Sequence, residues 1–398
     1  MNDYYTDSLL QLAANGRLRT LKPLVGRNGC RIVLKGREML NLTSNDYLGL
    51  AGDKRIHQKF YSGMNEGNIL DNFGLGVASS RLLTGDSATA HTLEETLRTT
   101  YGKEACLLFN SGYHANIGIL PPLFGKKDLI LSDKLNHASI MDGMRLCQAQ
   151  HKRYRHCDYG HLAGLLEKYR KTFDRVVIVS ESVFSMDGDV ADLAELVTLK
   201  ERFDCLLYLD EAHAIGLYGP LGLGMAEEQG QLQHIDLLVG TFGKALASVG
   251  AFLLCSATLR EYLINHSRSL IFTTALPPIV LFWNHFIFKE MLSYGERRSG
   301  LKILATTLRQ KLRDNNIHTA GSTNIVPVIL GNDTLAVVLA EAMQEMGYLI
   351  FPVRPPTVPE GTSRFRLSLT ADMLEVDIAS IASDLAGLMQ RFKKDLPI

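Results

Sequence analysis

The stretch VGTFGKALASVG, residues 239–250, places a single lysine directly after an apolar run. Glycines and alanines surround Lys244 and leave room beside its amine. An amine in such a setting can form a Schiff base with an aldehyde. Earlier in the chain, the sequence DEAH follows another apolar run and supplies an acid, Asp210, and an imidazole, His213.

Further groups capable of chemistry follow other apolar runs. They are Ser111, Gly112, Tyr113, His137, Glu181, Ser185 and Thr241. Each has an ordinary explanation when taken alone: Asp210 could cap a helix, His137 could be a loop histidine and Lys244 could lie on the surface. We favour a shared function because the elements that carry these residues are expected to bring them to one place.

Six apolar runs predict the strands of a sheet. They are residues 104–110, 128–133, 175–182, 205–213, 236–242 and 250–256. Helical patterns such as HLAGLLEKYRKTF and DLAELVTLKERF separate most of them. Continuously apolar strands that alternate with helices are typical of a mainly parallel sheet with helices on both faces. Ligands bind beyond the carboxyl ends of such strands, where the reactive residues stand.

The chain is expected to divide into three parts. Residues 1–43 form an N-terminal arm, 44–299 a large α/β domain, and 300–398 a smaller C-terminal α+β domain after a polar break near 293–300. The beginning of the chain has early acidic residues and no apolar core, unlike a secretory signal peptide. The longest apolar stretch, LPPIVLFWNHFIF, is too short for a bilayer span and predicts a buried helix.

Composition and charge are ordinary for a globular protein. Among 398 residues, 42 Lys plus Arg balance 42 Asp plus Glu. This zero net charge argues against nucleic acid or an anionic membrane as the main partner. The six cysteines form no C-x-x-C pair, and Cys106 and Cys205 lie in apolar runs. We therefore expect packed, reduced cysteines and a cytoplasmic location.

The reactive groups match the needs of pyridoxal phosphate. Main-chain N–H groups around Gly112 suit a phosphate, and Lys244 suits a Schiff base with an aldehyde. An acid can pair with the pyridine nitrogen, and a flat imidazole can stack on the ring. No complete G-x-G-x-x-G, G-x-x-x-x-G-K-[ST] or H-E-x-x-H pattern occurs, so dinucleotide, nucleoside triphosphate and metal sites have less support.

The sequence resembles the α-oxoamine synthases, a family of fold-type I pyridoxal-phosphate enzymes, over nearly its whole length. The segments that carry the resemblance are SNDYLGL, SSRLLTGDSATAHTLEETL, SGYHANIG, SDKLNHASI, ESVFSMDGD, DEAHAIGLYGPLGLG, TFGKAL and FTTALPP. The resemblance implies a transferase fold, with a seven-stranded, mainly parallel sheet sandwiched by helices and a smaller α+β domain. It also implies a homodimer with shared active sites.

The same resemblance implies roles for single residues. Lys244 would carry the cofactor as a Schiff base and move the substrate proton, Asp210 would pair with the pyridine nitrogen, and His137 would stack on the ring. His213 completes the implied catalytic set. The other implied cofactor contacts are Ser111, Gly112, Tyr113, Glu181, Ser185 and Thr241, with Thr273 or Thr274 at the phosphate of the partner subunit. The implied substrate contacts are Arg19, Asn45, His137, Thr357 and Arg366, with Arg366 gripping the amino-acid carboxylate.

The segment RPPTVPEGTSRFRLSLTA, residues 354–371, most resembles the family members that act in biotin biosynthesis. The resemblance implies an acyltransferase that condenses L-alanine with a pimeloyl thioester and releases CO2. The acyl carrier stays open between coenzyme A and acyl-carrier protein. Two alternatives also stay open: a relative with another amino acid or acyl donor, such as glycine with acetyl-CoA, and a cofactor-binding relative without catalysis.

Overall fold

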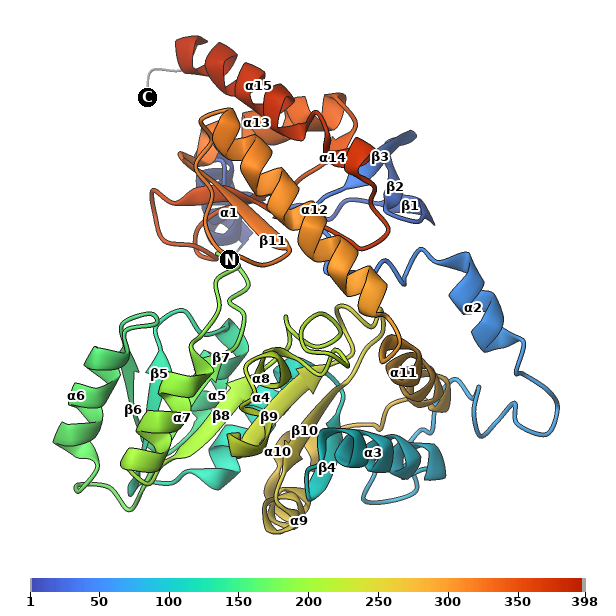
Figure 1. The fold of residues 1–398 in the computed structure, drawn as a ribbon, viewed down its shortest axis with the longest axis vertical. Helices are drawn as coiled ribbons and strands as arrows, with labels where there is room; N and C mark the ends of the chain where they lie inside the picture. The colour runs from blue at the N-terminus through green and yellow to red at the C-terminus, as the bar shows by residue number, and fades with distance from the viewer. Residues whose placement is uncertain (1, 396–398) are drawn as a thin grey trace. The chain divides into compact units, whose positions relative to one another are not determined.

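A computed structural model describes residues 2–395, which divide into two compact units (Figure 1). We call residues 54–184 and 190–298 the large unit. The small unit comprises residues 2–53, 185–189 and 299–395. Within residues 2–395, no helix has both the length and the apolar composition that a membrane span requires.

A seven-stranded sheet forms the centre of the large unit, in the order β4-β10-β9-β8-β7-β5-β6. Its strands are β4 (Ala105–Phe109), β5 (Asp128–Asp133), β6 (Gln150–Tyr154), β7 (Arg175–Glu181), β8 (Leu206–Asp210), β9 (Leu237–Thr241) and β10 (Ala251–Cys255). Neighbouring strands are parallel, except that β10 runs antiparallel to both β4 and β9. The predicted α/β fold class is therefore confirmed, and all six predicted strands form.

One strand of this sheet, β6, was not among the predicted strands. Its residues, QHKRY, are mostly polar, and it lies at the edge of the sheet, where it pairs only with β5. Four of the five β6 residues are exposed or half-buried, so this strand does not need a continuous apolar run, whereas the other edge strand, β4, is buried and apolar throughout.

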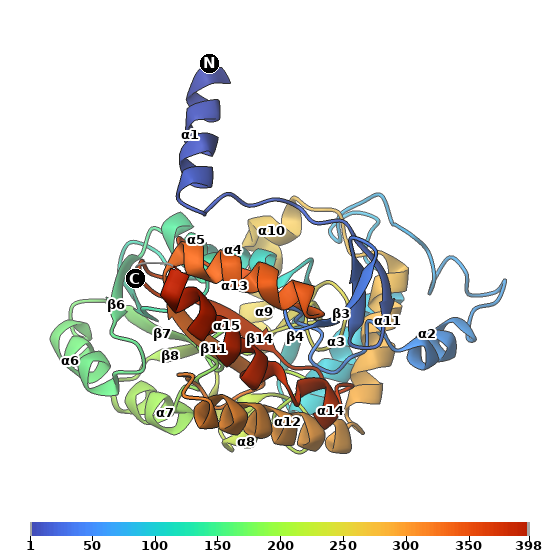
Figure 2. The same cartoon turned by 90° about the horizontal axis from the view of Figure 1, so that it is seen from above.

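Helices cover both faces of this sheet. The helices of the large unit are α2 (Lys54–Tyr61), α3 (Ala88–Tyr101), α4 (Gly112–Leu123), α5 (Ala138–Leu146), α6 (Tyr159–Tyr169), α7 (Leu193–Arg202), α8 (Met225–Glu228), η1 (Leu232–His234), α9 (Ala257–His266), α10 (Arg268–Ile271) and α11 (Pro278–Met291). On one face, α4 and α5 bury Ile119 and Ile140 in a cluster with Val239 of β9. On the other, Tyr101 of α3 packs against Phe252 of β10, with ring centroids 5.9 Å apart. Both views show α6 and α7 beside the β6–β8 half of the sheet (Figures 1 and 2).

Strand direction brings chemically active residues to one edge of the sheet. The register of β7 and β8 pairs Glu181 with Asp210 at the carboxyl ends of both strands. Because β10 is antiparallel to β4 and to β9, those two strands point the same way. Ser111, just after β4, and Thr241, the last residue of β9, therefore lie at the same edge as the two acids.

The small unit contains two small sheets, ordered β1-β2-β3-β12 and β11-β14-β13. Its strands are β1 (Leu24–Asn28), β2 (Arg31–Leu34), β3 (Arg37–Asn41), β11 (Ile325–Gly331), β12 (Tyr348–Leu349), β13 (Pro352–Val353) and β14 (Ser363–Ser368). Its helices are α1 (Asn2–Ala14), α13 (Asp333–Glu345), α14 (Glu375–Ile378) and α15 (Ile381–Asp395), together with most of α12 (Gly295–Asp314).

Two details of the chain differ from the sequence-based expectation. Helix α12 begins at Gly295, so most of the predicted break at 293–300 is helical. Strand β3 pairs in parallel with β12, which groups residues 2–53 with the C-terminal residues. The domain boundaries 1–43, 44–299 and 300–398 remain predictions, because the two units are groups of residues that pack together and do not by themselves establish domains.

Candidate active site

Asp210, at the carboxyl end of β8, has a buried and firmly oriented side chain. Its carboxylate accepts hydrogen bonds from Asn116 Nδ2 at 3.0 Å and from the Ala212 main-chain N–H at 2.9 Å. Asn116 is held in turn, since its amide donates to Ser139 Oγ at 2.8 Å and its carbonyl accepts from the Tyr208 hydroxyl. This network fixes the direction of the acid, as a partner for a pyridinium nitrogen requires.

Lys244 acts electrostatically on two of the predicted residues. Burial lowers the pKa of the His137 imidazole, and the positive charge of Lys244 lowers it further, against an opposing effect of Asp210. Burial and the negative charge of Asp210 raise the pKa of Glu181 well above its ordinary value, while Lys244 opposes them. The His137 main-chain N–H also donates to Glu181 Oε1 at 2.5 Å. The large unit thus brings Lys244, His137, Glu181 and Asp210 together.

The amino end of α4 offers main-chain donors to an anion. Ser111 caps this helix, because its hydroxyl accepts from the His114 N–H at 3.2 Å. The N–H groups of Gly112 and Tyr113 stand in the first turn, where a helix supplies no internal acceptor. A Cβ atom on Gly112 would lie 4.0 Å from Thr241 Oγ1, so these two residues share one corner. The donors and the helix dipole at this corner suit a phosphate.

Thr241 already has hydrogen-bond partners in the turn that leads to Lys244. Its hydroxyl donates to the Gly250 carbonyl at 2.9 Å and accepts from the Gly243 N–H at 3.1 Å. Its predicted contact with a phosphate stays a prediction. His213, three residues after the end of β8, is buried, and its predicted hydrogen bond to the cofactor ring stays a prediction as well.

Three more predicted cofactor contacts have partners in the large unit. The Tyr113 hydroxyl donates to Asp142 Oδ2 at 2.9 Å. Asn110 Nδ2 donates to Thr273 Oγ1 at 3.0 Å and to the Thr274 carbonyl at 2.7 Å. The role of the two threonines concerns the phosphate of a second subunit and stays a prediction.

Arg366, in β14 of the small unit, is the centre of a hydrogen-bond network. It donates to Asn45 Oδ1 at 3.1 Å, to Ser368 Oγ at 2.8 Å, to the Tyr47 hydroxyl at 2.7 Å and to the Ser185 carbonyl at 2.5 Å. Among the described residues, four of its five N–H groups thus have acceptors. A carboxylate would have to displace Asn45 or Tyr47 to be held by two of these groups.

The other predicted substrate residues also lie in the small unit. Arg19 Nη2 donates to Thr357 Oγ1 at 3.3 Å and to the Pro355 carbonyl at 3.4 Å. Ser185 belongs to this unit too, and its carbonyl is the acceptor for Arg366. The roles of Arg19, Asn45, Thr357, Ser185 and Arg366 toward substrate or cofactor remain predictions.

Sequence reasoning missed Asn116 and Ser139, which orient Asp210 and His137. Ser139 Oγ lies 2.7 Å from His137 Nδ1 and accepts from Asn116 Nδ2. A signal for Asn116 was present in SGYHAN, because a residue four positions after Gly112 lies on the same face of a helix. The contact between α4 and α5 that joins Asn116 to Ser139 has no comparable signal in the sequence.

Replacement of His137 by phenylalanine is expected to reduce the acid sensitivity of the cofactor-free protein. The folded pKa of His137 is lowered, whereas an unfolded histidine binds a proton below about pH 6.5. The unfolded chain therefore binds more protons, and the free energy of unfolding falls as the pH drops below about 6.5. Denaturant midpoints across this range should fall more steeply for wild type than for His137→Phe. Parallel curves would contradict the expectation.

The sheet and the site together define a fold-type I pyridoxal-phosphate enzyme. The residues fit this cofactor: the large unit gathers an amine, an acid held by Asn116, a buried imidazole and the amino end of α4. The sequence profile of the family "Aminotransferase class I and II" matches residues 37–385. The chain belongs to this family of pyridoxal-phosphate enzymes and, within it, to the family of the 8-amino-7-oxononanoate synthases.

Individual relatives support this assignment. The 8-amino-7-oxononanoate synthase of Chlorobaculum parvum is 50% identical over 378 residues, which cover 95% of this chain and 96% of the relative. A crystal structure of 8-amino-7-oxononanoate synthase from Francisella tularensis has a TM-score of 0.74 at 26% identity, covering 89% of this chain and 98% of that one. Serine palmitoyltransferase from S. paucimobilis, solved with bound pyridoxal phosphate and myriocin, has a TM-score of 0.88 at 28% identity, covering 98% and 97%.

Proposed function

We propose that this protein is an acyltransferase of biotin biosynthesis. It condenses L-alanine with a pimeloyl thioester and forms 8-amino-7-oxononanoate, CO2 and a free thiol. The observation that carries the proposal is the convergence of Lys244, His137, Glu181 and Asp210 in a chain half identical to an 8-amino-7-oxononanoate synthase. The fold alone does not choose the substrates, since a serine palmitoyltransferase shares it.

Pyridoxal phosphate, when bound, supplies an aldehyde for the substrate amine and a ring that accepts the electrons left at the α-carbon. In our proposal Asp210 holds the pyridine nitrogen in its protonated form, which is the better electron acceptor. His137, whose pKa is lowered chiefly by burial, presents a neutral imidazole to the ring. Gly112 and Tyr113 hold the phosphate through their main-chain N–H groups.

Lys244 moves the proton at the α-carbon of L-alanine. Its Nζ removes that proton, the α-carbon forms a bond to the thioester carbonyl carbon, and the sulfur leaves as a thiolate, which takes a proton from solvent. The bond from the α-carbon to the carboxylate then breaks and releases CO2, and Lys244 returns a proton to the α-carbon. Each change balances without an external oxidant or reductant.

In this proposal Arg366 holds the alanine carboxylate until CO2 leaves. Asn45 and Tyr47 accept hydrogen bonds that keep the guanidinium in place beforehand, and the carboxylate replaces them as the acceptor of these Arg366 N–H groups. Arginine suits this task because its planar fork pairs with both carboxylate oxygens.

The proposal includes a homodimer in the cytoplasm. Within the large unit, Leu70, Leu75, Leu83 and Phe272 are 78%, 85%, 79% and 70% exposed, respectively. These exposed apolar side chains support the proposed interface, since apolar surface left in water is costly. A second copy of the chain is the occupant we propose, with Thr273 or Thr274 reaching its phosphate. The six free cysteines agree with a reducing environment.

The purified protein, with pyridoxal phosphate, L-alanine and pimeloyl-CoA, is expected to yield 8-amino-7-oxononanoate. Mass spectrometry identifies the product, and a thiol assay measures the coenzyme A released. Glycine with acetyl-CoA and L-serine with palmitoyl-CoA are the matched controls. If the protein turned over either control pair but did not turn over L-alanine with pimeloyl-CoA, the chain would belong to another branch of the family.

Arg366→Lys tests the carboxylate contact in the same assay. Lysine keeps the charge but cannot form two parallel hydrogen bonds, so the KM for L-alanine should rise by about tenfold, the equivalent of ~1.4 kcal/mol. The KM for pimeloyl-CoA should stay within a factor of about two, because Arg366 is proposed to contact L-alanine and not the acyl donor. Equal changes in both constants would argue against the proposed contact.

A further inference from the structure

Asn116, in α4, is the junction of a buried hydrogen-bond network in the large unit. Its Nδ2 donates to Asp210 Oδ2 at 3.0 Å and to Ser139 Oγ at 2.8 Å. Its Oδ1 accepts from the Tyr208 hydroxyl. Ser139 Oγ lies 2.7 Å from His137 Nδ1. Asp210 and His137, two side chains of the proposed catalytic set, are therefore connected through one amide and one hydroxyl.

The chemistry of Asp210 fixes the direction of the Asn116 amide. At neutral pH a carboxylate carries no hydrogen and only accepts, so Asn116 must turn its NH2 group toward Asp210. The amide oxygen then faces Tyr208. Burial raises the pKa of Tyr208 well above its ordinary value, so this hydroxyl keeps the hydrogen that it donates. A reversed amide would place its oxygen against the carboxylate and lose this bond to Asp210.

His137 Nδ1 faces two donors, which determines the tautomer of the ring. It accepts from the Ser139 main-chain N–H at 3.2 Å, as the cap of α5. A hydrogen on Nδ1 would point at this N–H, so Nδ1 carries a lone pair. Ser139 Oγ accepts from Asn116 and has its own hydrogen left for Nδ1. The hydrogen of the neutral His137 ring is therefore on Nε2.

Charged groups on three other parts of the chain act on the same imidazole. Burial is the largest effect on the pKa of His137 and lowers it, and the positive charge of Lys244 lowers it further. Asp210, at the end of β8, and Asp142, in α5, oppose them, and the net shift is downward. Glu181, at the end of β7, accepts from the His137 main-chain N–H and not from the ring. Electrostatics and hydrogen bonding thus both favour the neutral ring.

A ring in this state cannot act as a base toward a substrate. Its Nε2 already carries a hydrogen, and its Nδ1 is occupied by the two donors of Ser139. In the proposed function, on which this step rests, removal of the proton at the α-carbon of L-alanine then falls to Lys244. His137 is left with the tasks of a flat neutral ring and a hydrogen-bond donor at Nε2.

We propose that Asn116 is a positioning residue that keeps His137 neutral, with its hydrogen on Nε2, while it directs the Asp210 carboxylate. One amide sets both groups because its two hydrogens go to Asp210 and to Ser139. Without the amide, the Ser139 hydroxyl turns and its oxygen can accept from a hydrogen on Nδ1. Only the Ser139 N–H then opposes that hydrogen, so His137 binds a proton more easily.

Nitrogen-15 NMR of the full-length protein, with and without pyridoxal phosphate, reports which ring nitrogen of each histidine carries hydrogen. The signals that are missing in His137→Phe belong to His137. In wild type at neutral pH the hydrogen should be on Nε2 alone. In Asn116→Ala and in Ser139→Ala we expect a mixture of tautomers, and the midpoint of the His137 titration should move to higher pH. No substrate takes part, so this result does not depend on the proposed function.

Asn284→Ala is the matched control for loss of a buried amide. Asn284 is also a fully buried asparagine in a helix of the large unit, α11, and its Nδ2 donates to the Val249 carbonyl at 3.0 Å. Asn284→Ala should keep the wild-type signals of His137. A hydrogen on Nδ1 in wild type, or wild-type signals in both Asn116→Ala and Ser139→Ala, overturns the proposal. The same changes in Asn284→Ala also overturn it, because they would report a loosened fold.

The holoenzyme separates the two tasks of Asn116, since Ser139→Ala leaves the bond between Asn116 and Asp210 in place. Exchange of the α-hydrogen of L-alanine for deuterium is followed by NMR without an acyl donor. Asn116→Ala should be about tenfold slower than Ser139→Ala, because it alone removes a hydrogen bond to a charged group. Equal rates in the two variants overturn the role toward Asp210. No exchange in wild type counts against the proposed function, and the tautomer of His137 still decides on Asn116.

Discussion

Lys244→Ala is expected to abolish condensation and the visible absorbance that borohydride bleaches. The alanine has no amine to hold the cofactor covalently and none to move the proton at the α-carbon. Both functions disappear together, so kcat/KM should fall by at least about 10⁴-fold, as when a catalytic nucleophile is removed. Turnover assays and absorbance spectra before and after borohydride measure the two effects.

Lys103→Ala is the matched control for this change. Lys103 also belongs to the large unit, and its ammonium donates to the Ile235 carbonyl at 2.7 Å. Loss of this contact should cost about 1 kcal/mol of stability. It should leave both the absorbance and the turnover of the folded protein intact. Full turnover by Lys244→Ala would refute both the proposed mechanism and the assignment of the cofactor site.

Asp210→Asn should produce the second-largest effect, a fall in kcat of about 10²–10³-fold, the range for removal of one electrostatic partner of the transition state. Asparagine retains an oxygen for the Ala212 N–H but has no negative charge to keep a pyridine nitrogen protonated. Stability should fall by about 1–3 kcal/mol, because the new amide group would face the Asn116 donor. Steady-state kinetics and thermal unfolding separate the two quantities.

The adjacent acid offers a control with the opposite expectation. Glu211 is fully buried, which raises its pKa to about 7, and it accepts from Ser182 Oγ at 2.6 Å and from the Met225 and Ala226 N–H groups at 3.0 and 2.7 Å. In Glu211→Gln an amide donor would face one of these donors, at a cost of about 1–3 kcal/mol. Activity per folded molecule should stay near wild type. If Asp210→Asn kept full kcat while Glu211→Gln lost it, the assigned roles would be wrong.

The sequence predicted the parts of the fold that depend on local pattern. Six of the seven strands of the large sheet could be recognised because each is apolar and buried along nearly its whole length. Strand β6 was not recognised because its residues are mostly polar and are exposed or half-buried. Residues 1–43 were expected to form an arm. Strand β3 of this segment pairs with β12, about three hundred positions further along the chain, a distance that no local pattern spans.

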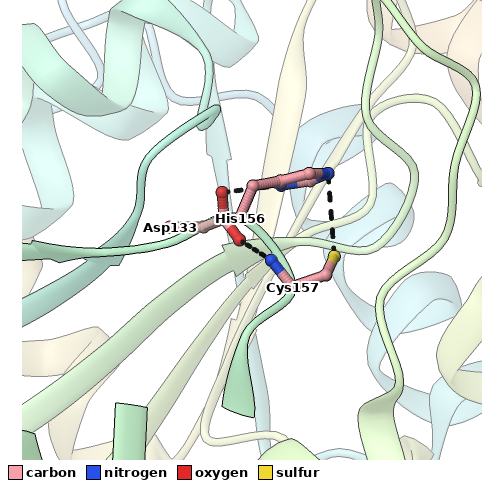
Figure 3. Close-up of side chains that lie close together, drawn as sticks. All are labelled: Asp133, His156 and Cys157. Carbon is pink, nitrogen blue, oxygen red and sulfur yellow. Dashed lines mark hydrogen bonds and ion pairs between the residues drawn. The ribbon is translucent and has the colours of Figure 1, made fainter. Parts of the chain in front are cut away.

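The residues of the candidate site likewise divide into those that the sequence predicted and those that only the tertiary structure revealed. Residue type and position after strands were enough to single out Lys244, Asp210 and His137, because the carboxyl ends of parallel strands must meet at one edge. Only tertiary structure placed Asn116 and Ser139 behind them and joined Asp133 to His156 and Cys157 (Figure 3). These contacts depend on how α4 packs on α5 and how β5 pairs with β6, which follows from side-chain packing across elements and leaves no periodic trace in the sequence.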